Sequence, residues 1–199
     1  MARPIAKDYD RKRHHILKHA AKIFARQGFD RASMAQLAAA CGISKANIYH
    51  YYSGKEALLF GILDSYLCRL RDRICGLDIA ALPVSQQFQA LVLETLLAYE
   101  GADHEHRIQS KGFGMLPKLQ QTQLKEYQRD IVACYSAVLL RVAPKVFGDD
   151  RPKLHSTTMS VFGMLNWYYM WNTESGTAPR AQYAKLVSNL TLHGINGLD

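Results

Sequence analysis

Apolar residues recur along most of this chain with the three- and four-residue spacing that places them on one face of an α-helix. In the first such stretch, Leu17, Ala20 and Phe24 follow this spacing, and Gly28 comes after it as a C-cap glycine would. No stretch of useful length alternates apolar and polar residues in the way a β-strand does. The pattern therefore predicts an all-α fold.

Glycine, proline and short polar runs interrupt the apolar pattern and set the expected helix boundaries. We expect about nine helices, at residues 9–27, 33–40, 45–51, 54–75, 86–99, 104–115, 118–146, 153–171 and 180–194. The chain is expected to contain an N-terminal domain over residues 1–53 and a C-terminal domain over residues 76–199. A linking helix at about residues 54–75 would join them.

Residues 33–56 contain two short helical stretches joined by a turn at Gly42. Glycine is favoured in such a turn because the backbone has to adopt a left-handed conformation there. Serines stand where N-caps are expected: Ser33 with Gln36 as a capping box, Ser44, and Ser53 with Glu56 as a second box. Two short helices around a glycine turn form the helix-turn-helix unit, whose second helix enters the major groove of DNA.

Positive charge is concentrated at the N-terminal end of the chain. Residues 1–53 contain ten Lys or Arg and three Asp or Glu, so they carry +7 of the net charge of +8. The other 146 residues are almost neutral. A basic domain attached to a neutral one indicates that the first binds a polyanion, although a basic face kept for solubility would have the same composition.

Composition argues against several other classes of protein. No apolar run is long enough to span a membrane, and the N-terminus lacks an apolar signal region, so we expect a cytoplasmic protein. The four cysteines have no C-x-x-C spacing, and four reduced thiols are the default expectation in the cytoplasm. His104 and His106 would not face each other on a helix, and neither a metal nor another cofactor is expected.

Residues 42–58 read G-I-S-K-A-N-I-Y-H-Y-Y-S-G-K-E-A-L. They resemble the signature of the TetR/AcrR family of transcriptional regulators, which is roughly G-V-S-x-x-x-L-Y-x-Y-F-x-S-K-E-x-L. The similarity extends over residues 9–64 and includes the F-A-R-Q-G-F sequence at residues 24–29. It implies an all-helical homodimer, in which each subunit has a three-helix DNA-binding head and a larger ligand-binding body. The last two helices of each subunit would pair with those of its partner in a four-helix bundle.

The same resemblance assigns DNA contacts to positions in and around the second helix of the motif, which Ser44 would cap. Three residues would bind the phosphate backbone, namely Ser33, Tyr49 and Lys55. Four would face base edges, namely Lys45, Ala46, Asn47 and His50. This assignment fits their chemistry, because lysine can donate to guanine and asparagine can pair with adenine. Of Tyr51 and Tyr52, one would pack in the core of the head and the other would reach the DNA backbone.

The C-terminal domain contains an aromatic-rich stretch at residues 162–172. Helical spacing places Trp167, Met170 and Trp171 on one face, which would form either the dimer core or the wall of an apolar pocket. The stretch resembles the penultimate helix of family members that respond to acyl-CoA thioesters. The opening residues 1–10 are similar to those of regulators of phenylacetate breakdown, which respond to phenylacetyl-CoA. These resemblances imply a repressor that an acyl-CoA effector releases from its operator.

An acyl-CoA ligand needs cations for its phosphates and an apolar slot for its acyl group. The candidate residues are Arg107, Lys111, Tyr127, Met164, Asn166, Trp167 and Met170, and further cations are available at Lys118, Lys125 and Arg129. Each of these cations, taken alone, fits a solvated helix face equally well.

Two other functions compete with a ligand-controlled DNA-binding protein. A helical-bundle enzyme is disfavoured, because the sequence contains no E-x-x-H, H-E-x-x-H or G-x-S-x-G motif and no phosphate-binding loop. A constitutive DNA-binding protein without an effector would not need a neutral body of this size. The absence of a pocket in that body would favour the constitutive function.

Overall fold

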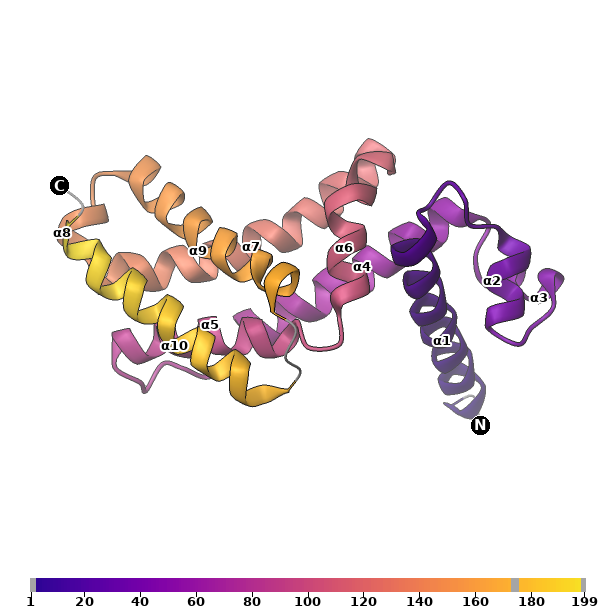
Figure 1. Ribbon diagram of the computed structural model, residues 1–199, viewed down its shortest axis with the longest axis horizontal. Coiled ribbons are helices and arrows are strands. Elements are labelled where there is room, and N and C mark those ends of the chain that lie inside the picture. The colour runs from indigo at the N-terminus through magenta and orange to yellow at the C-terminus, as the bar shows by residue number, and fades with distance from the viewer. Residues whose placement is uncertain (1–2, 173–175, 198–199) are drawn as a thin grey trace. The chain divides into compact units, whose positions relative to one another are not determined.

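A computed structural model describes residues 3–172 and 176–197, and all regular secondary structure in this part of the chain is helical (Figure 1). The elements are α1 (Arg3–Gln27), α2 (Met34–Ala40), α3 (Lys45–Tyr51), α4 (Lys55–Cys75), α5 (Val84–Ala98), α6 (Asp103–Gly112), η1 (Phe113–Met115), α7 (Lys118–Val142), α8 (Pro144–Phe147), α9 (Arg151–Trp171), α10 (Thr177–Gly194) and η2 (Ile195–Gly197). The predicted all-α fold is confirmed. Within the described residues, no helix combines the length and the apolar character that crossing a membrane requires.

Most helix boundaries lie within a few residues of those predicted, and prolines accompany the two largest differences. α1 begins at Arg3 instead of residue 9, with Pro4 in the first turn, where the missing N–H of proline costs no hydrogen bond. The single helix predicted over residues 118–146 was wrong. α7 ends at Val142 because Pro144 cannot continue it, and Pro144 instead begins the short helix α8.

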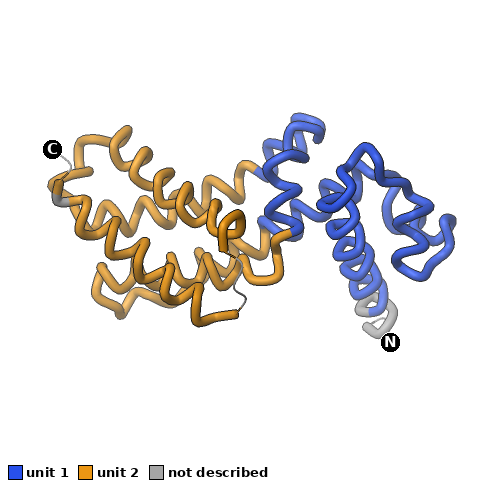
Figure 2. Tube along the Cα trace, viewed as in Figure 1, with its two compact units in different colours: residues 1–67, 104–124 blue, residues 68–103, 125–199 orange. Residues whose placement is uncertain are grey.

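The chain folds into two compact units, which Figure 2 shows in different colours. Unit 1 comprises Met1–Leu67 and His104–Leu124, and unit 2 comprises Cys68–Asp103 and Lys125–Asp199. Both α4 and α7 therefore contribute residues to the two units. The units do not follow the division expected from the sequence, since α6 groups with the N-terminal helices. The assignment of separate tasks to residues 1–53 and 76–199 remains a prediction.

The core of unit 1 is formed by the apolar faces of its first four helices. Ile16, Leu37, Ile48 and Leu58, one from each of these helices, are at most 2% exposed. Burial of side chains of this size is the main source of stability in a small helical unit, at about 1.5–3 kcal/mol for each. This core fixes α2 and α3 on α1 and α4.

In unit 2, α10 packs along α5, and α9 contacts both helices. A polar contact lies at the centre of this packing. Tyr135 of α7 is fully buried, and its hydroxyl donates to the Leu91 carbonyl oxygen at 2.8 Å and lies 2.6 Å from the Thr95 hydroxyl. The rings of Phe88 and Phe162 pack against it. Burial raises the pKa of the Tyr135 phenol well above its usual value, so this side chain stays neutral.

Cys75 at the end of α4 and Cys134 in α7 form a disulfide bond, with their Cα atoms 6.0 Å apart. The expectation of four reduced thiols is therefore wrong for this structure. The two cysteines are separated by 59 residues in sequence, so their spacing does not reveal the pair. Cys41 and Cys68 are free.

Candidate nucleic-acid interface

The turn between α2 and α3 has the geometry of a helix-turn-helix unit. Gly42 has a φ of 66°, in the left-handed region that glycine adopts at no steric cost. The Ser44 hydroxyl accepts a hydrogen bond from the Asn47 backbone N–H at 3.1 Å, which caps the first turn of α3 as predicted. Ser33 caps α2 in the same way, accepting from the Gln36 N–H at 3.2 Å.

Two details of the predicted capping boxes were wrong. The Gln36 side chain does not reach back to Ser33 but donates to the Gln27 side-chain oxygen at 2.8 Å. α4 begins one residue later than a cap at Ser53 would require. The Gly54 carbonyl oxygen accepts the first hydrogen bond of this helix, from the Leu58 N–H at 3.2 Å.

The outward side of α3 is open to solvent. Ile48 is fully buried and holds the helix on the core, whereas the side chains around it are exposed: Lys45, Ala46, Asn47, Tyr49 and His50. Within the described residues, neither the Lys45 ammonium nor the Tyr49 hydroxyl makes a hydrogen bond. α3 therefore presents unused hydrogen-bonding groups on one continuous face.

The structure distinguishes the two tyrosines that end the motif. Tyr52 is 5% exposed, and the Arg13 guanidinium lies 5.4 Å from the centre of its ring. Burial raises the pKa of the Tyr52 hydroxyl. Tyr51 is only half-buried, and its ring packs 5.0 Å from the ring of Tyr9. Tyr52 is thus the core residue of the pair, and Tyr51 is the one that DNA could reach.

Lys55 contacts the loop between α1 and α2. Its ammonium donates to the carbonyl oxygens of Phe29 at 3.0 Å and Asp30 at 3.1 Å, and it lies 4.8 Å from the centre of the Phe29 ring. Two of the three N–H donors of the ammonium are therefore used within unit 1. Lys55 consequently has a structural role beside the phosphate contact that the resemblance implies.

The exposed Ser33 hydroxyl only accepts in its capping bond, so its own hydrogen remains to be donated.

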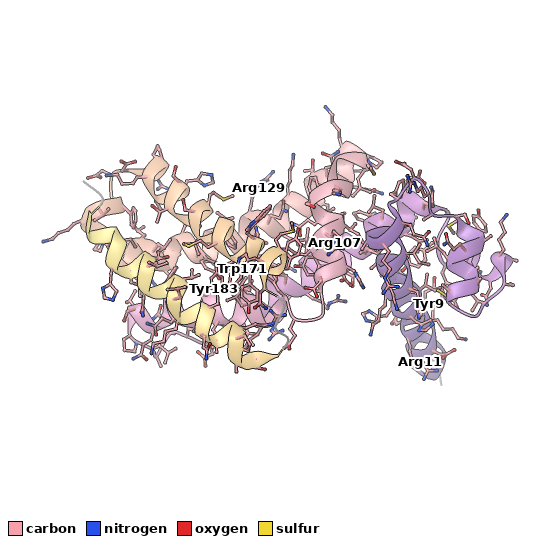
Figure 3. The ribbon with its side chains drawn as sticks, in the orientation of Figure 1. Tyr9, Arg11, Arg107, Arg129, Trp171 and Tyr183 are labelled. Atoms are coloured by element: carbon pink, nitrogen blue, oxygen red, sulfur yellow. A yellow bond between two sulfur atoms is a disulfide. The ribbon has the colours of Figure 1, made fainter. Side chains whose placement is uncertain are left out.

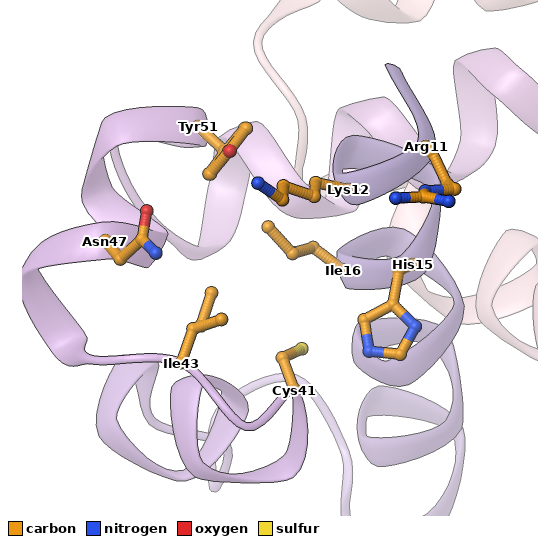
Figure 4. Close-up of a pocket in the computed structure, with 8 residues that line it drawn as sticks. All are labelled: Arg11, Lys12, His15, Ile16, Cys41, Ile43, Asn47 and Tyr51. Carbon is orange, nitrogen blue, oxygen red and sulfur yellow. The ribbon is translucent and has the colours of Figure 1, made fainter. Parts of the chain in front are cut away.

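A pocket of about 330 Å³ lies between α1 and the α2–α3 segment (Figure 4). Three of its lining residues are apolar or thiol side chains, Ile16, Cys41 and Ile43, and the others are polar: Arg11, Lys12, His15, Asn47 and Tyr51. The basic side chains of α1 that line it were not recognised from the sequence as site residues. Only the overall positive charge of the segment pointed to them.

The α1 cations that line this pocket are partly neutralised. The Asp8 carboxylate pairs with the Lys12 ammonium and the Arg11 guanidinium, each at 2.7 Å. Hydrogen bonds from Lys12 and Arg11 lower the pKa of Asp8. One acid against two bases leaves α1 with positive charge beside α3.

The residues predicted to bind an effector do not all belong to one unit. Arg107 and Lys111 are exposed on α6, in unit 1, and the other five lie in unit 2: Tyr127, Met164, Asn166, Trp167 and Met170. The Arg71 guanidinium lies 5.0 Å from the centre of the Tyr127 ring. The Asn166 side-chain oxygen accepts a hydrogen bond from the Tyr99 hydroxyl at 2.7 Å.

Unit 2 carries an exposed apolar face. Its side chains come from α9 and α10, and each is more than half exposed: Trp167, Met170, Trp171, Leu186 and Leu190. The inward side of α9 is held by Tyr168, which is 3% exposed and stacks on Tyr183 with ring centres 4.8 Å apart. Figure 3 labels Trp171 and Tyr183, whose ring centres are 5.1 Å apart. Large apolar side chains exposed in this number on two contacting helices indicate an interaction surface.

The described residues contain no group of three or more side chains that could hold a metal ion. His106, one of the two histidines considered from the sequence, has its Nδ1 atom 2.6 Å from the Tyr66 hydroxyl.

Two family profiles match the chain. Residues 16–62 match the bacterial regulatory proteins of the tetR family, and residues 81–195, more than half of the chain, match the tetracyclin repressor-like C-terminal domain. The chain belongs to the TetR family. A solved TetR-family transcriptional regulator from Bordetella parapertussis 12822 is 30% identical to it, with a TM-score of 0.84. That match covers 94% of this chain and 97% of the other.

Two further proteins are similar to this chain. MftR of Mycobacterium tuberculosis is 26% identical over 126 residues, which cover 62% of this TetR-family chain and 63% of MftR. The match thus spans less than two thirds of that relative. The structure of AibR in complex with isovaleryl coenzyme A and operator DNA is 22% identical, with a TM-score of 0.75, and covers 90% of this chain and 97% of AibR. At this identity the likeness establishes the fold alone.

Proposed function

We propose that this TetR-family protein is a transcriptional repressor that binds an operator as a homodimer and is released by a small effector. The proposal that the protein binds DNA rests on the solvent-exposed face of α3. This helix is capped by Ser44 and anchored by Ile48, and its outward side chains belong to the strongly basic end of the chain. Exposed donors on a rigid helix after a glycine turn are what major-groove recognition requires.

Three side chains on this face suit particular contacts with DNA. Lys45 can donate to guanine O6 or N7, and Asn47 can pair with adenine N6 and N7. The exposed hydroxyl of Tyr49 suits a phosphate oxygen. Arg11 and Lys12, which line the pocket beside α3, add positive charge that attracts the DNA backbone.

The exposed apolar face of α9 and α10 supports a homodimer. Side chains such as Trp167 and Leu190 leave water when the same face of a second subunit covers them, as a two-fold symmetric interface requires. Two α3 helices would then enter successive major grooves about 34 Å apart, which predicts a pseudo-palindromic operator.

For the effector we propose an acyl-CoA thioester, with phenylacetyl-CoA as the first candidate. The resemblance of residues 162–172 and 1–10 to regulators with such effectors motivates this choice, and AibR shares the fold and binds isovaleryl coenzyme A. The exposed cations Arg107 and Lys111 suit the phosphates of coenzyme A.

α4 provides the route by which an effector would act on DNA binding, because its residues belong to both units. An effector that prefers one position of this helix shifts the protein toward that position. Operator and effector then weaken each other's binding by the same factor, typically about 5–150-fold.

The test is fluorescence anisotropy with labelled DNA from upstream of the gene, titrated with phenylacetyl-CoA, isovaleryl-CoA, phenylacetate and free coenzyme A. We expect a thioester to release the DNA and the free acid to leave it bound. Tight DNA binding that none of the four compounds changes would refute the thioester part and favour a constitutive DNA-binding protein. Absence of DNA binding would contradict the function as a whole.

A further inference from the structure

Contacts of different kinds join the last two turns of α4 to α7 within unit 2. The Arg71 guanidinium lies 3.6 Å from the Asp130 carboxylate and 5.0 Å from the centre of the Tyr127 ring. One turn later, Cys75 is bonded to Cys134. The covalent bond thus closes a contact that an ion pair and a cation–π interaction already align.

This bond is open to small reagents. Cys75 is exposed at the end of α4, and Cys134 is half-buried. Their Cα separation of 6.0 Å lies within the range of ordinary disulfides, so the pair can close without a backbone rearrangement. Thiol–disulfide exchange requires an attacking thiolate to reach a sulfur atom, which exposure of Cys75 permits.

The proposed function gives this bond a regulatory meaning, and the inference rests on that function. A protein that binds chromosomal DNA works in the compartment where small thiols keep cysteines reduced. Disulfides formed there are usually transient and serve catalysis or redox sensing instead of permanent stabilisation. A cysteine pair that joins the two helices shared by both units, with one of its members exposed to solvent, is suited to sensing.

We propose that Cys75 and Cys134 form a reversible redox site that controls operator affinity and reacts with the disulfides and thiols of low-molecular-weight compounds. In the oxidising direction one cysteine thiolate attacks the disulfide RSSR, forming a mixed disulfide and releasing RS⁻, which takes up a proton. The second thiolate displaces the remaining RS group. The protein loses two thiols and gains one S–S bond, and RSSR is reduced to two RSH.

The oxidised protein should bind the operator more tightly. The bond fixes the end of α4 on α7, and fewer accessible positions of α4 mean less conformational freedom to lose when DNA binds. Reduction removes the covalent link and leaves non-covalent contacts, such as those of Arg71, between the two helices. We expect reduction to raise the operator Kd by about fivefold or more, the lower end of typical coupling between sites.

The experiment uses the full chain equilibrated in mixtures of oxidised and reduced glutathione. Alkylation followed by mass spectrometry counts the free thiols, and anisotropy measures the operator Kd of the same samples. Because Cys41 is buried, the protein is unfolded in denaturant during alkylation; we then expect Cys41 and Cys68 to be the two alkylated residues in the oxidised protein, and all four cysteines to react after reduction.

Serine variants identify the residues responsible. Cys75→Ser and Cys134→Ser should each keep the Kd of the reduced protein in oxidising mixtures. Cys68→Ser is the matched control, because it removes a free thiol from the same helix and should respond to glutathione as the wild type does. Circular dichroism spectra of all three variants establish that they are folded.

Four reactive thiols in every glutathione mixture would overturn the proposal. An operator Kd that stays the same while the bond forms would also overturn it. Absence of operator binding in both redox states would contradict the proposed function and the regulatory consequence together, while the thiol count would still decide whether the pair is redox-active.

Discussion

Replacing Lys55 by methionine distinguishes an internal anchor from a simple DNA contact. Methionine keeps an apolar stem beside Phe29 but removes the ammonium, which donates to the carbonyl oxygens of Phe29 and Asp30. A hydrogen bond from a charged donor contributes about 1.5–3 kcal/mol. One of the two bonds is only part-buried and the other is exposed, so we expect a combined loss of about 2 kcal/mol. In a chain of 199 residues, a loss of about 2 kcal/mol lowers the Tm by about 4–8 °C.

The assay is thermal and urea unfolding followed by circular dichroism, with Lys45→Met as the matched control. Lys45 is exposed on α3 and makes no hydrogen bond within the described residues, so its loss should change stability by less than about 0.5 kcal/mol. A Lys55→Met variant as stable as the wild type would refute the anchoring role. The salt dependence of DNA binding tests the second role, because loss of a phosphate contact lowers the slope of log K against log[salt] by about 0.9.

Three further substitutions test other parts of the molecule. Asn47→Ala should lose about 1–3 kcal/mol of discrimination at one base position; an unchanged consensus in binding-site selection would show that Asn47 reads no base. Trp167→Ser should weaken the dimer in sedimentation velocity, whereas Leu119→Ser, which removes an exposed leucine from α7, should not. A Trp167→Ser dimer as strong as that of the wild type would exclude the α9 face as the interface. Tyr135→Phe should cost about 1–3 kcal/mol, because the Leu91 carbonyl oxygen and the Thr95 hydroxyl lose a buried partner; an unchanged urea midpoint would contradict this.

The helix-turn-helix could be predicted from the sequence because its determinants are local. Ser44 caps α3 through a backbone N–H three residues away, and Gly42 adopts its left-handed conformation within a single turn. A pattern of neighbouring residues specifies such features completely. The all-α fold class could be predicted for the same reason, since helical periodicity is also a local property of the sequence.

Features that depend on distant residues could not be predicted. The bond between Cys75 and Cys134 joins two residues that are 59 positions apart in the sequence, and only tertiary packing places them together. The two carbonyl contacts of Lys55 likewise cross 25 and 26 residues of sequence. The choice between Tyr51 and Tyr52 as the core residue was left open because both follow the same local pattern. Tertiary burial decides it, because Tyr52 is 5% exposed whereas Tyr51 is only half-buried.

The most direct test of DNA recognition by α3 is the affinity of the full chain for its own upstream DNA compared with a scrambled duplex of the same length and composition. Both are measured by anisotropy at the same physiological salt concentration, because the non-specific term depends strongly on salt. We expect the upstream DNA to bind at least about 10³-fold more tightly, as sequence-specific regulators do. Equal affinity for the two duplexes would mean that the basic end of the chain binds DNA only through its charge, and would contradict recognition by α3.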